Sequence, residues 1–268
     1  MESGSMATKL LREVLAWLED YKKHTGCKGV VLGISGGKDS TTVAMLATKV
    51  WGRGVVGVLM PNGVQADIED SRAICDCLEL RNITVNIGNA FGKLCDDVNR
   101  GLEAFGAEVT PKTKTNLPPR LRMATLYTVA QSLGYRVIGT GNASESYVGW
   151  TTKFGDSACD LNPLGNLTCS EVIALGTELA EEFGLPLKYV QKVPSDGLSG
   201  RSDEDNFGFT YRQLDTFMVD GCQAEVDGAL IPEEIREKIG NMHAMSAHKR
   251  EMPKTFQPSG EFNRKFKR

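Results

Sequence analysis

A glycine-rich turn between an apolar strand and a helix constrains the fold of this 268-residue chain most strongly. Residues 29–34 form a short apolar run typical of a buried parallel strand, and residues 38–50 have helical composition. Between them stands Ser35-Gly36-Gly37-Lys38-Asp39-Ser40. Adjacent glycines let a backbone turn tightly and approach an anion, and the helix that follows offers unpaired N–H groups. The turn therefore predicts a phosphate site in an α/β protein.

An acidic residue inside this turn indicates a divalent cation. Asp39 would repel a phosphate unless a cation stood between them, and Mg²⁺ is the usual choice for oxygen ligands. The seven cysteines include no CxxC pair, so we expect reduced thiols and a metal site built from oxygen atoms. Neither GxxxxGK[ST] nor GxGxxG is present, which excludes the two best-known nucleotide loops.

Alternating strand and helix patterns predict one α/β domain, a Rossmann-like twisted parallel sheet flanked by helices. Strands are expected at residues 29–34, 54–60, 83–87 and 136–139. Helices are expected at residues 7–24, 38–50, 65–80, 120–134, 169–183, 210–219 and 232–246. The polar stretch 141–165 is predicted to be a functional loop. Residues 1–6 are interpreted as an expression-vector remnant, which leaves 7–268 as the domain.

Composition excludes several partners. The formal net charge of −3 gives no basic field for nucleic acid, and the basic residues near the C-terminus are interpreted as a solvated tail. No apolar run is long enough to cross a bilayer, and the N-terminus lacks a signal-peptide pattern. We therefore expect a cytoplasmic protein without a nucleic-acid or membrane partner.

The hexapeptide Ser35–Ser40 resembles the pyrophosphate-binding loop of the N-type ATP pyrophosphatases, which share the adenine nucleotide alpha hydrolase fold. These enzymes cleave ATP between its α- and β-phosphates and transfer AMP to a carboxylate or carbonyl oxygen. A nitrogen or sulfur nucleophile then replaces the AMP. The resemblance implies ATP as co-substrate, bound by Gly33, Ile34, Ser35, Gly36, Gly37, Lys38, Asp39 and Ser40.

Four further stretches resemble the NAD synthetase family within that superfamily. They are Asn116–Met123, with its Arg-x-Arg-Met, Gly139–Glu145, Thr152–Leu164, and His248-Lys249. The resemblance implies that Thr140 and Ser195 contact ATP and that Asp39 and Glu145 hold Mg²⁺. It also assigns the dinucleotide substrate, deamido-NAD, to Arg120, Lys153, Asp156, Asp160, His248 and Lys249. The family places its His-Lys pair across a homodimer interface, so a homodimer is expected, with Asp39, Glu145 and Lys153 as the catalytic set.

The chain departs from the family pattern in two places. Many members carry a phosphate-binding lysine where this chain has Cys169, and Lys188 and Lys192 are candidate substitutes. The mobile loop reads Pro194-Ser195-Asp196-Gly197-Leu198, so that Ser195 replaces a threonine hydroxyl, with a short spacer before the next acidic pair. These differences concern how the chain holds and covers ATP.

The resemblance implies ATP-dependent amidation of deamido-NAD, with ammonia used directly because no glutaminase domain is expected. Other readings stay open at this stage. A tRNA-thiolating or other amide-forming ligase would share the loop, and a nucleotide-binding sensor could retain it without turnover. Individual residues also have ordinary alternatives, since Glu145 could simply cap a helix and His248 could pair with a helix end.

Overall fold

The molecule is built around a parallel sheet in the order β3-β2-β1-β4. The computed structural model describes residues 5–64, 68–192 and 202–256. The strands are β1 (Val30–Gly33), β2 (Val55–Leu59), β3 (Arg81–Thr84) and β4 (Arg136–Val137). The expected parallel α/β architecture is confirmed, with β1 at the centre. Strand order reverses between β1 and β4, which is where open α/β sheets bind ligands.

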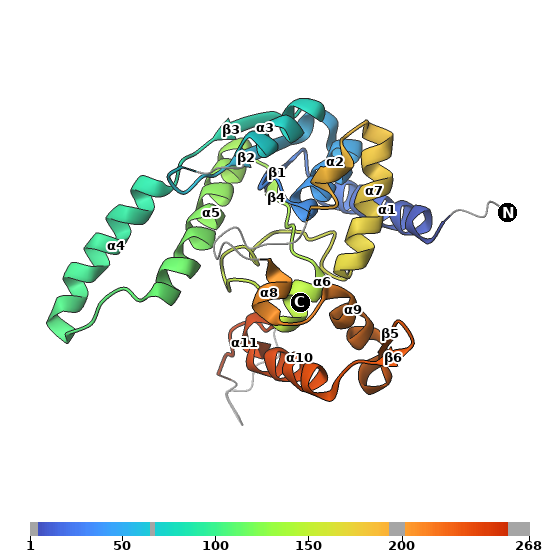
Figure 1. Cartoon of the computed structure of the whole chain (residues 1–268). Helices are drawn as coiled ribbons and strands as arrows, with labels where there is room; N and C mark the ends of the chain where they lie inside the picture. Colours follow the sequence, from blue (N-terminus) through green and yellow to red (C-terminus); the bar gives the residue numbers. More distant parts are fainter. Residues whose placement is uncertain (1–4, 65–67, 193–201, 257–268) are drawn as a thin grey trace, which may run out of the picture.

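Helices cover both faces of the sheet (Figure 1). Alternate residues of β1 point to opposite faces: Leu32 joins the larger apolar cluster and Val31 the smaller one. The larger cluster contains side chains from α1 (Met6–Thr25), α2 (Lys38–Trp51), α3 (Ile68–Cys77) and α7 (Cys169–Phe183). The smaller cluster lies under α5 (Pro111–Leu133). These two layers fix the carboxyl ends of the strands along one edge.

One helical pair projects away from this body as an arm. Figure 1 shows α4 (Gly88–Leu102) and the first part of α5 extending beyond the sheet. The predicted start of α5 at residue 120 is wrong, because the helix begins at Pro111, capped by Thr110. Pro118 and Pro119 lie inside it, where the sequence suggests a break. A cap and an N-terminal proline start this helix well before the prolines that seemed to delimit it.

The last quarter of the chain packs into a group of short elements below the sheet (Figure 1). These are α8 (Asp203–Phe207), α9 (Tyr211–Asp220), the hairpin β5 (Glu225–Val226) and β6 (Ala229–Leu230), α10 (Glu233–Met245) and α11 (Ala247–Arg250). Phe207 is fully buried among Trp150, Phe209 and Tyr211. This aromatic cluster holds the end of the chain against α6 (Ala143–Val148) and α7.

Several boundaries differ from the sequence predictions. The third strand is Arg81–Thr84 rather than 83–87, although backbone pairing with the β2 segment continues through Val85 and Ile87. The predicted loop 141–165 contains the helix α6, which is too short for apolar periodicity to reveal. Short 3₁₀ turns occur at Gly52–Gly54, Glu103–Phe105, Leu187–Tyr189 and Gly221–Gln223. That residues 1–6 are foreign stays a prediction, although Ser5 caps α1 and Met6 opens it.

No helix in the described ranges is both long and apolar enough to cross a membrane.

Candidate active site

The glycine turn joins β1 to α2 as the sequence predicts. Gly36 has a φ of +80°, and a Cβ there would lie 3.3 Å from both Asp70 Cβ and Ser71 Oγ of α3. A side chain at residue 36 would therefore be strained and would press on α3. Gly33 ends β1, and Ile34 extends the strand by donating its N–H to Val58 at 3.1 Å. The turn thus lies at the carboxyl edge of the central strand.

Hydrogen bonds within the turn fix its shape and leave the first turn of α2 accessible to a ligand. The hydroxyls of Ser35 and Ser40 lie 2.9 Å apart, and Gly37 N–H donates to Ser35 Oγ at 3.2 Å. The N-cap of α2 is Gly37, which supplies no capping side chain. The first-turn N–H groups therefore have no capping side chain, and they carry the positive end of the helix dipole. This arrangement suits an anion such as pyrophosphate.

A second loop follows β4 and meets the glycine turn. Asn142 caps α6 by accepting the N–H of Glu145 at 2.9 Å, and Glu145 accepts the N–H of Asn142 at 3.4 Å. The ordinary alternative for Glu145, helix capping, is therefore observed. Thr140 lies in the same loop and is partly buried. Loops from the neighbouring strands β1 and β4 thus supply polar groups at one point.

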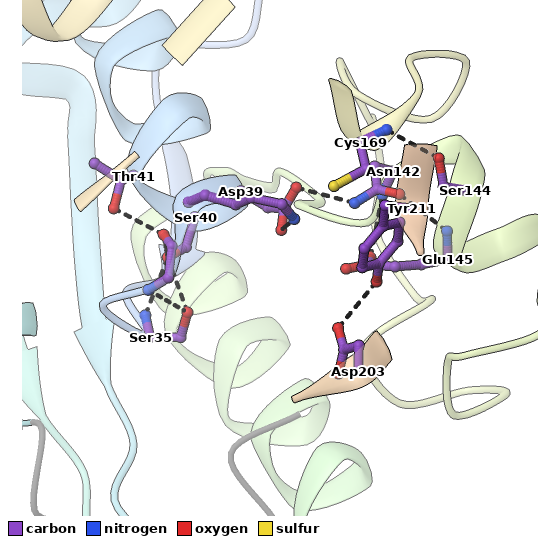
Figure 2. A network of polar contacts seen from close by, with 12 residues as sticks. Ser35, Asp39, Ser40, Thr41, Asn142, Ser144, Glu145, Cys169, Asp203 and Tyr211 are labelled. Carbon is purple, nitrogen blue, oxygen red and sulfur yellow. Dashed lines mark hydrogen bonds and ion pairs between the residues drawn. The ribbon is translucent and has the colours of Figure 1, made fainter. Parts of the chain in front are cut away.

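Asp39 and Glu145 come together where the two loops meet. The Asn142 amide donates to Asp39 Oδ1 at 3.0 Å, and Figure 2 shows the Asp39 side chain extending from α2 toward Asn142. Burial, followed by the negative charge of Asp39, raises the pKa of Glu145 to about 8. A buried acid beside a second carboxylate is a place where a cation would be favourable.

A lysine already provides one positive charge at this point. Lys38 is 3% exposed, and its Nζ donates to Asp39 Oδ2 at 2.6 Å. It also lies 5.7 Å from the ring centroid of Tyr211. Burial lowers the pKa of Lys38, but Asp39 and Glu145 outweigh burial and raise it above its ordinary value. The sequence predicts Lys38 only as one residue of the loop, and its burial between carboxylates is a finding of the structure.

The donor set fits Mg²⁺. Asp39 and Glu145 supply carboxylate oxygens, and no group of three or more His, Cys, Asp or Glu side chains forms a metal cluster within the described part of the chain. Mg²⁺ commonly takes one or two carboxylates and completes its shell with water and phosphate oxygens. A site with two carboxylates beside a phosphate loop matches that habit and does not match a closed zinc or calcium cage.

Residues beyond the predicted set complete this half of the site. Tyr211 donates its hydroxyl to Asp203 Oδ2 at 2.9 Å, and Trp150 Nε1 donates to Asp203 Oδ1 at 3.0 Å. Burial, with Glu145 and Asp203 nearby, raises the pKa of Tyr211 so that it stays a neutral donor. The Ser71 hydroxyl is buried beside Gly36 without a hydrogen-bond partner. Among the site residues outside the predicted set, Asn142 is the one that the sequence could have indicated. It stands three residues before a glutamate, which is the spacing of a capping box.

A second, basic hollow holds several residues predicted to contact the dinucleotide. It has a volume of about 320 Å³. Its lining includes Tyr127, Lys153, Phe154, Lys249 and Arg250. Lys249 Nζ donates to the carbonyls of Gly149 and Thr151, each at 2.7 Å. Lys153 Nζ donates to the carbonyls of His248 and Glu251. Both ammonium groups are thus fixed at the wall of one cavity.

Other predicted residues contact the segments that line this hollow or belong to them. Arg120 Nε lies 3.4 Å from the carbonyl oxygen of Lys153, and Asp156 Oδ1 accepts the N–H of Thr152 at 2.8 Å. Burial lowers the pKa of Lys249; the negative charge of Asp156 opposes this, while the positive charges of Lys112 and Arg120 add to it. The gathered positive charge suits a substrate with phosphate and carboxylate groups. His248 is exposed, and its Nδ1 lies 3.2 Å from the Met245 carbonyl, which is the helix-end role described above.

Asp160 lies beside β4 and makes its hydrogen bonds there. Its Oδ2 accepts the N–H of Val137 at 2.7 Å, and its own N–H donates to the Val137 carbonyl at 2.8 Å. Burial and then the charge of Asp160 raise the pKa of Tyr127 to about 12. Tyr127 also lines the basic hollow, so Asp160 acts on a side chain of that cavity.

The candidate substitutes for the missing lysine lie close to the glycine turn, where they pair with an acidic residue of α3, and their role stays a prediction. Lys188 and Lys192 lie 3.8 Å and 3.2 Å from Asp70, next to the glycine turn. Cys169 is buried, and Lys38 is the cation whose charge acts on its thiol. Ser195 falls in residues 193–201, outside the described residues. A larger hollow of about 500 Å³ beside the end of α1 is lined by none of the predicted residues.

The sheet, the glycine turn and the paired carboxylates define a nucleotide-binding α/β protein of the ATP pyrophosphatase type. The family model described as NAD synthase matches residues 10–253. The chain therefore belongs to the NAD synthase family. An NH3-dependent NAD(+) synthetase from Alkaliphilus metalliredigens is 36% identical over 91% of this chain and 96% of its own. One from Pyrococcus furiosus is also 36% identical, over 90% of this chain and 93% of its own.

Solved structures agree with this assignment. An NMN synthetase from Francisella tularensis superposes with a TM-score of 0.78 and 32% identity, covering 94% of this chain and 99% of its own. An NH3-dependent NAD synthetase from Campylobacter jejuni, in complex with nitrate, gives a TM-score of 0.74 and 25% identity. That match covers 94% of this chain and 100% of the other.

Proposed function

We propose that this chain is an ammonia-dependent NAD synthetase, which uses ATP to convert the nicotinate carboxylate of deamido-NAD to the amide of NAD. The observation that carries the proposal is the juxtaposition of two anion sites at the carboxyl edge of one sheet. The glycine turn at Ser35–Ser40 suits the pyrophosphate end of ATP, and the hollow with Lys153 and Lys249 suits a phosphorylated dinucleotide. Relatives named for this activity match nearly the whole chain.

The reaction has two steps. The substrate carboxylate attacks the α-phosphorus of ATP, forming the acyl adenylate and releasing pyrophosphate, which the Ser35–Ser40 turn holds. Ammonia then attacks the acyl carbon and loses one proton to solvent, and AMP leaves with the carboxylate oxygen it received. No protein nucleophile is needed, so positioning and charge neutralisation provide the rate. Lys153 and its basic neighbours orient the dinucleotide so that its carboxylate faces the nucleotide.

Asp39 and Glu145 are the residues that would hold Mg²⁺. When bound, the ion would neutralise negative charge on the phosphates. The support is the chemistry of the donor set: two converging carboxylates, one of them with a raised pKa, beside a turn whose N–H groups face an anion. ATP is the co-substrate, and its phosphates would share the shell of the ion with water.

One assay tests this proposal against its rivals. The protein is mixed with ATP, Mg²⁺, ammonium and deamido-NAD, and both pyrophosphate and NAD are measured. We expect equal amounts of the two products, each dependent on all four components. Pyrophosphate formed without the dinucleotide would indicate another amide- or thio-forming ligase. ATP binding without any pyrophosphate would indicate a sensor.

A second candidate substrate is the mononucleotide. The solved NMN synthetase has a TM-score of 0.78 to this chain, so the same fold serves a reaction named for a mononucleotide product. Offering deamido-NAD and nicotinate mononucleotide together at equal concentration separates the two. We expect NAD to dominate; an excess of nicotinamide mononucleotide would assign this chain to the second activity.

A homodimer belongs to the same proposal. The support is the arm itself, where Leu94 and Val98 lie one turn apart on α4 and are exposed, with the exposed Phe105 just beyond the end of that helix. Monomeric proteins rarely leave apolar side chains clustered on a projecting element, and a second copy would cover them. Substrate bound at the subunit interface is part of the same proposal.

A cytoplasmic location completes the proposal. All seven cysteines are free thiols, and several are buried without any neighbour to form a disulfide. Reduced thiols in this number are typical of proteins that work in a reducing compartment.

A further inference from the structure

The buried ammonium of Lys38 is more than a loop side chain. Lysine is almost never fully buried unless it is paired, because removing its charge from water is costly. Here the side chain is 3% exposed, and its Nζ donates to Asp39 Oδ2 at 2.6 Å. Asp39 Oδ1 in turn accepts from Asn142 at 3.0 Å. Both oxygens of the carboxylate are therefore satisfied by groups of the protein itself.

Helix geometry does not explain this contact. Lys38 and Asp39 are consecutive in the first turn of α2, and adjacent side chains on a helix do not face each other. A lysine is also unfavourable at a helix N-terminus, where the dipole is positive. The Lys38 chain nevertheless turns back to Asp39, with Glu145 and the Tyr211 ring also close to its charge. The pull of two carboxylates accounts for this position.

We propose that Lys38 is a built-in counter-cation, which holds Asp39 and Glu145 together while no divalent cation is bound and is displaced when one arrives. The inference rests on the proposed function, in which these same carboxylates hold Mg²⁺. A divalent ion and the ammonium of Lys38 repel each other, so the two compete for the same carboxylate oxygens. The lysine stem is long and flexible, so the displaced ammonium can reach the phosphates held by the neighbouring turn.

The proposal makes an unusual prediction: removing Lys38 should tighten metal binding. Mn²⁺ serves as the probe, titrated without nucleotide and followed by calorimetry or by loss of its free-ion EPR signal. Lys38→Met should bind Mn²⁺ at least about tenfold more tightly than the parent protein, since one nearby positive charge is removed. Lys38→Arg should keep the parent affinity. Lys49→Met, on the same helix but paired with Glu182 at the surface, is the matched control and should match the parent.

Thermal denaturation gives a readout that does not depend on activity. Metal-free Lys38→Met should melt at a lower temperature than Lys49→Met, because two carboxylates lose their cation, and Mn²⁺ should restore much of the loss. If Lys38→Met folds only with Mn²⁺, the proposal is supported. Failure to fold in either condition, or Mn²⁺ affinity equal to or weaker than the parent, would overturn it.

A further variant separates this inference from the proposed function. Asp39→Asn in the Lys38→Met background should lose the tightened Mn²⁺ binding. If binding persists there, the metal site proposed at Asp39 and Glu145 is wrong. If Asp39→Asn alone weakens Mn²⁺ binding while Lys38→Met does not strengthen it, the metal site stands and only the role of Lys38 fails.

Discussion

The side-chain amide of Asn142 joins the first turn of α6 to Asp39 in the first turn of α2. It donates to Asp39 Oδ1 at 3.0 Å, while its carbonyl oxygen accepts the N–H of Glu145 at 2.9 Å (Figure 2). The amide nitrogen thus donates to the carboxylate of Asp39, and the amide oxygen accepts the backbone N–H of Glu145. The carboxylate of Glu145 in turn accepts the backbone N–H of Asn142. An aspartate could not do both, because an ionised carboxylate only accepts.

Replacing this amide should damage the site more than the fold. Asn142→Ala removes a helix cap, which costs about 1 kcal/mol of stability, and leaves Asp39 without its positioning partner. We expect kcat/KM to fall by at least about tenfold, as for other residues that orient metal ligands. Thr168→Ala is the control, since it removes an equivalent capping box from α7 without touching Asp39. Equal activity losses in the two variants would reduce Asn142 to a structural cap.

Asp39→Ala should abolish adenylation while the chain still folds, with some loss of stability because the buried Lys38 loses its partner. The charge that faces the proposed ion is lost, and we expect pyrophosphate release to fall by more than about a hundredfold. Stopped assays of pyrophosphate and circular dichroism check the two halves of this expectation. Asp20→Ala, at an exposed carboxylate of α1, controls for loss of charge alone. Near-parent turnover in Asp39→Ala would remove this residue from the catalytic set.

Lys153→Ala should weaken binding of the dinucleotide and leave binding of ATP unchanged. The ammonium lines the basic hollow, and a charge-assisted contact of this kind is worth roughly tenfold or more in binding. KM for deamido-NAD should rise by that factor while KM for ATP changes little. Lys23→Ala, an exposed lysine of α1, provides the comparison. A rise confined to the KM of ATP would place Lys153 in the wrong half of the site.

The thiol of Cys169 should resist alkylation. Burial raises its pKa to about 12, and the charge of Lys38 offsets this only in part. Because the thiolate forms as pH rises through the pKa, about one thiol in ten thousand is ionised at pH 8. Mass spectrometry after iodoacetamide treatment should show Cys77 and Cys222 modified first, since both are exposed. The rate at Cys169 should still climb about tenfold per pH unit from 8 to 10; a plateau in that range would contradict the raised pKa.

Charges on the arm should separate the proposed dimer. Leu94→Glu combined with Val98→Glu places two carboxylates on the exposed apolar side of α4, where a second copy would bury them. Light scattering after gel filtration should show the parent as a dimer and the variant as a monomer. Val219→Glu, at an exposed position of α9, should leave the mass unchanged. A parent protein that elutes as a monomer would refute the dimer directly.

Apolar periodicity and turn chemistry predicted most of the sheet and its long helices. Val30 to Gly33 and Val55 to Leu59 are continuous apolar strands, as buried parallel strands must be. β3 is an edge strand with every side chain exposed, so its apolar pattern could not mark its limits. The sequence also did not predict the short helix α6 or the continuation of α5 through its two prolines. In both places caps and tertiary packing outweigh local preference.

The parts of the site that could be predicted are those in which the required residues are close together in the sequence. Ser35 to Ser40 needs glycine at residue 36 for its positive φ, and the Asn142-x-x-Glu145 spacing gives a capping box. Contacts made across the fold left no local pattern. Asp203 meets Tyr211 and Trp150 only because α8 and α9 pack below α6, and nothing in the sequence around Asp203 signals that burial.

The helix α5 belongs both to the arm and to the wall of the substrate hollow. One uninterrupted helix runs from Pro111 in the arm to Leu133 beside the sheet, with Arg120 and Tyr127 along its length. Because the arm and these groups belong to one helix, a contact that moves the arm would also move the groups that face the dinucleotide. Dilution that dissociates the proposed dimer should therefore weaken binding of the dinucleotide more than binding of ATP. Specific activity should then depend on protein concentration.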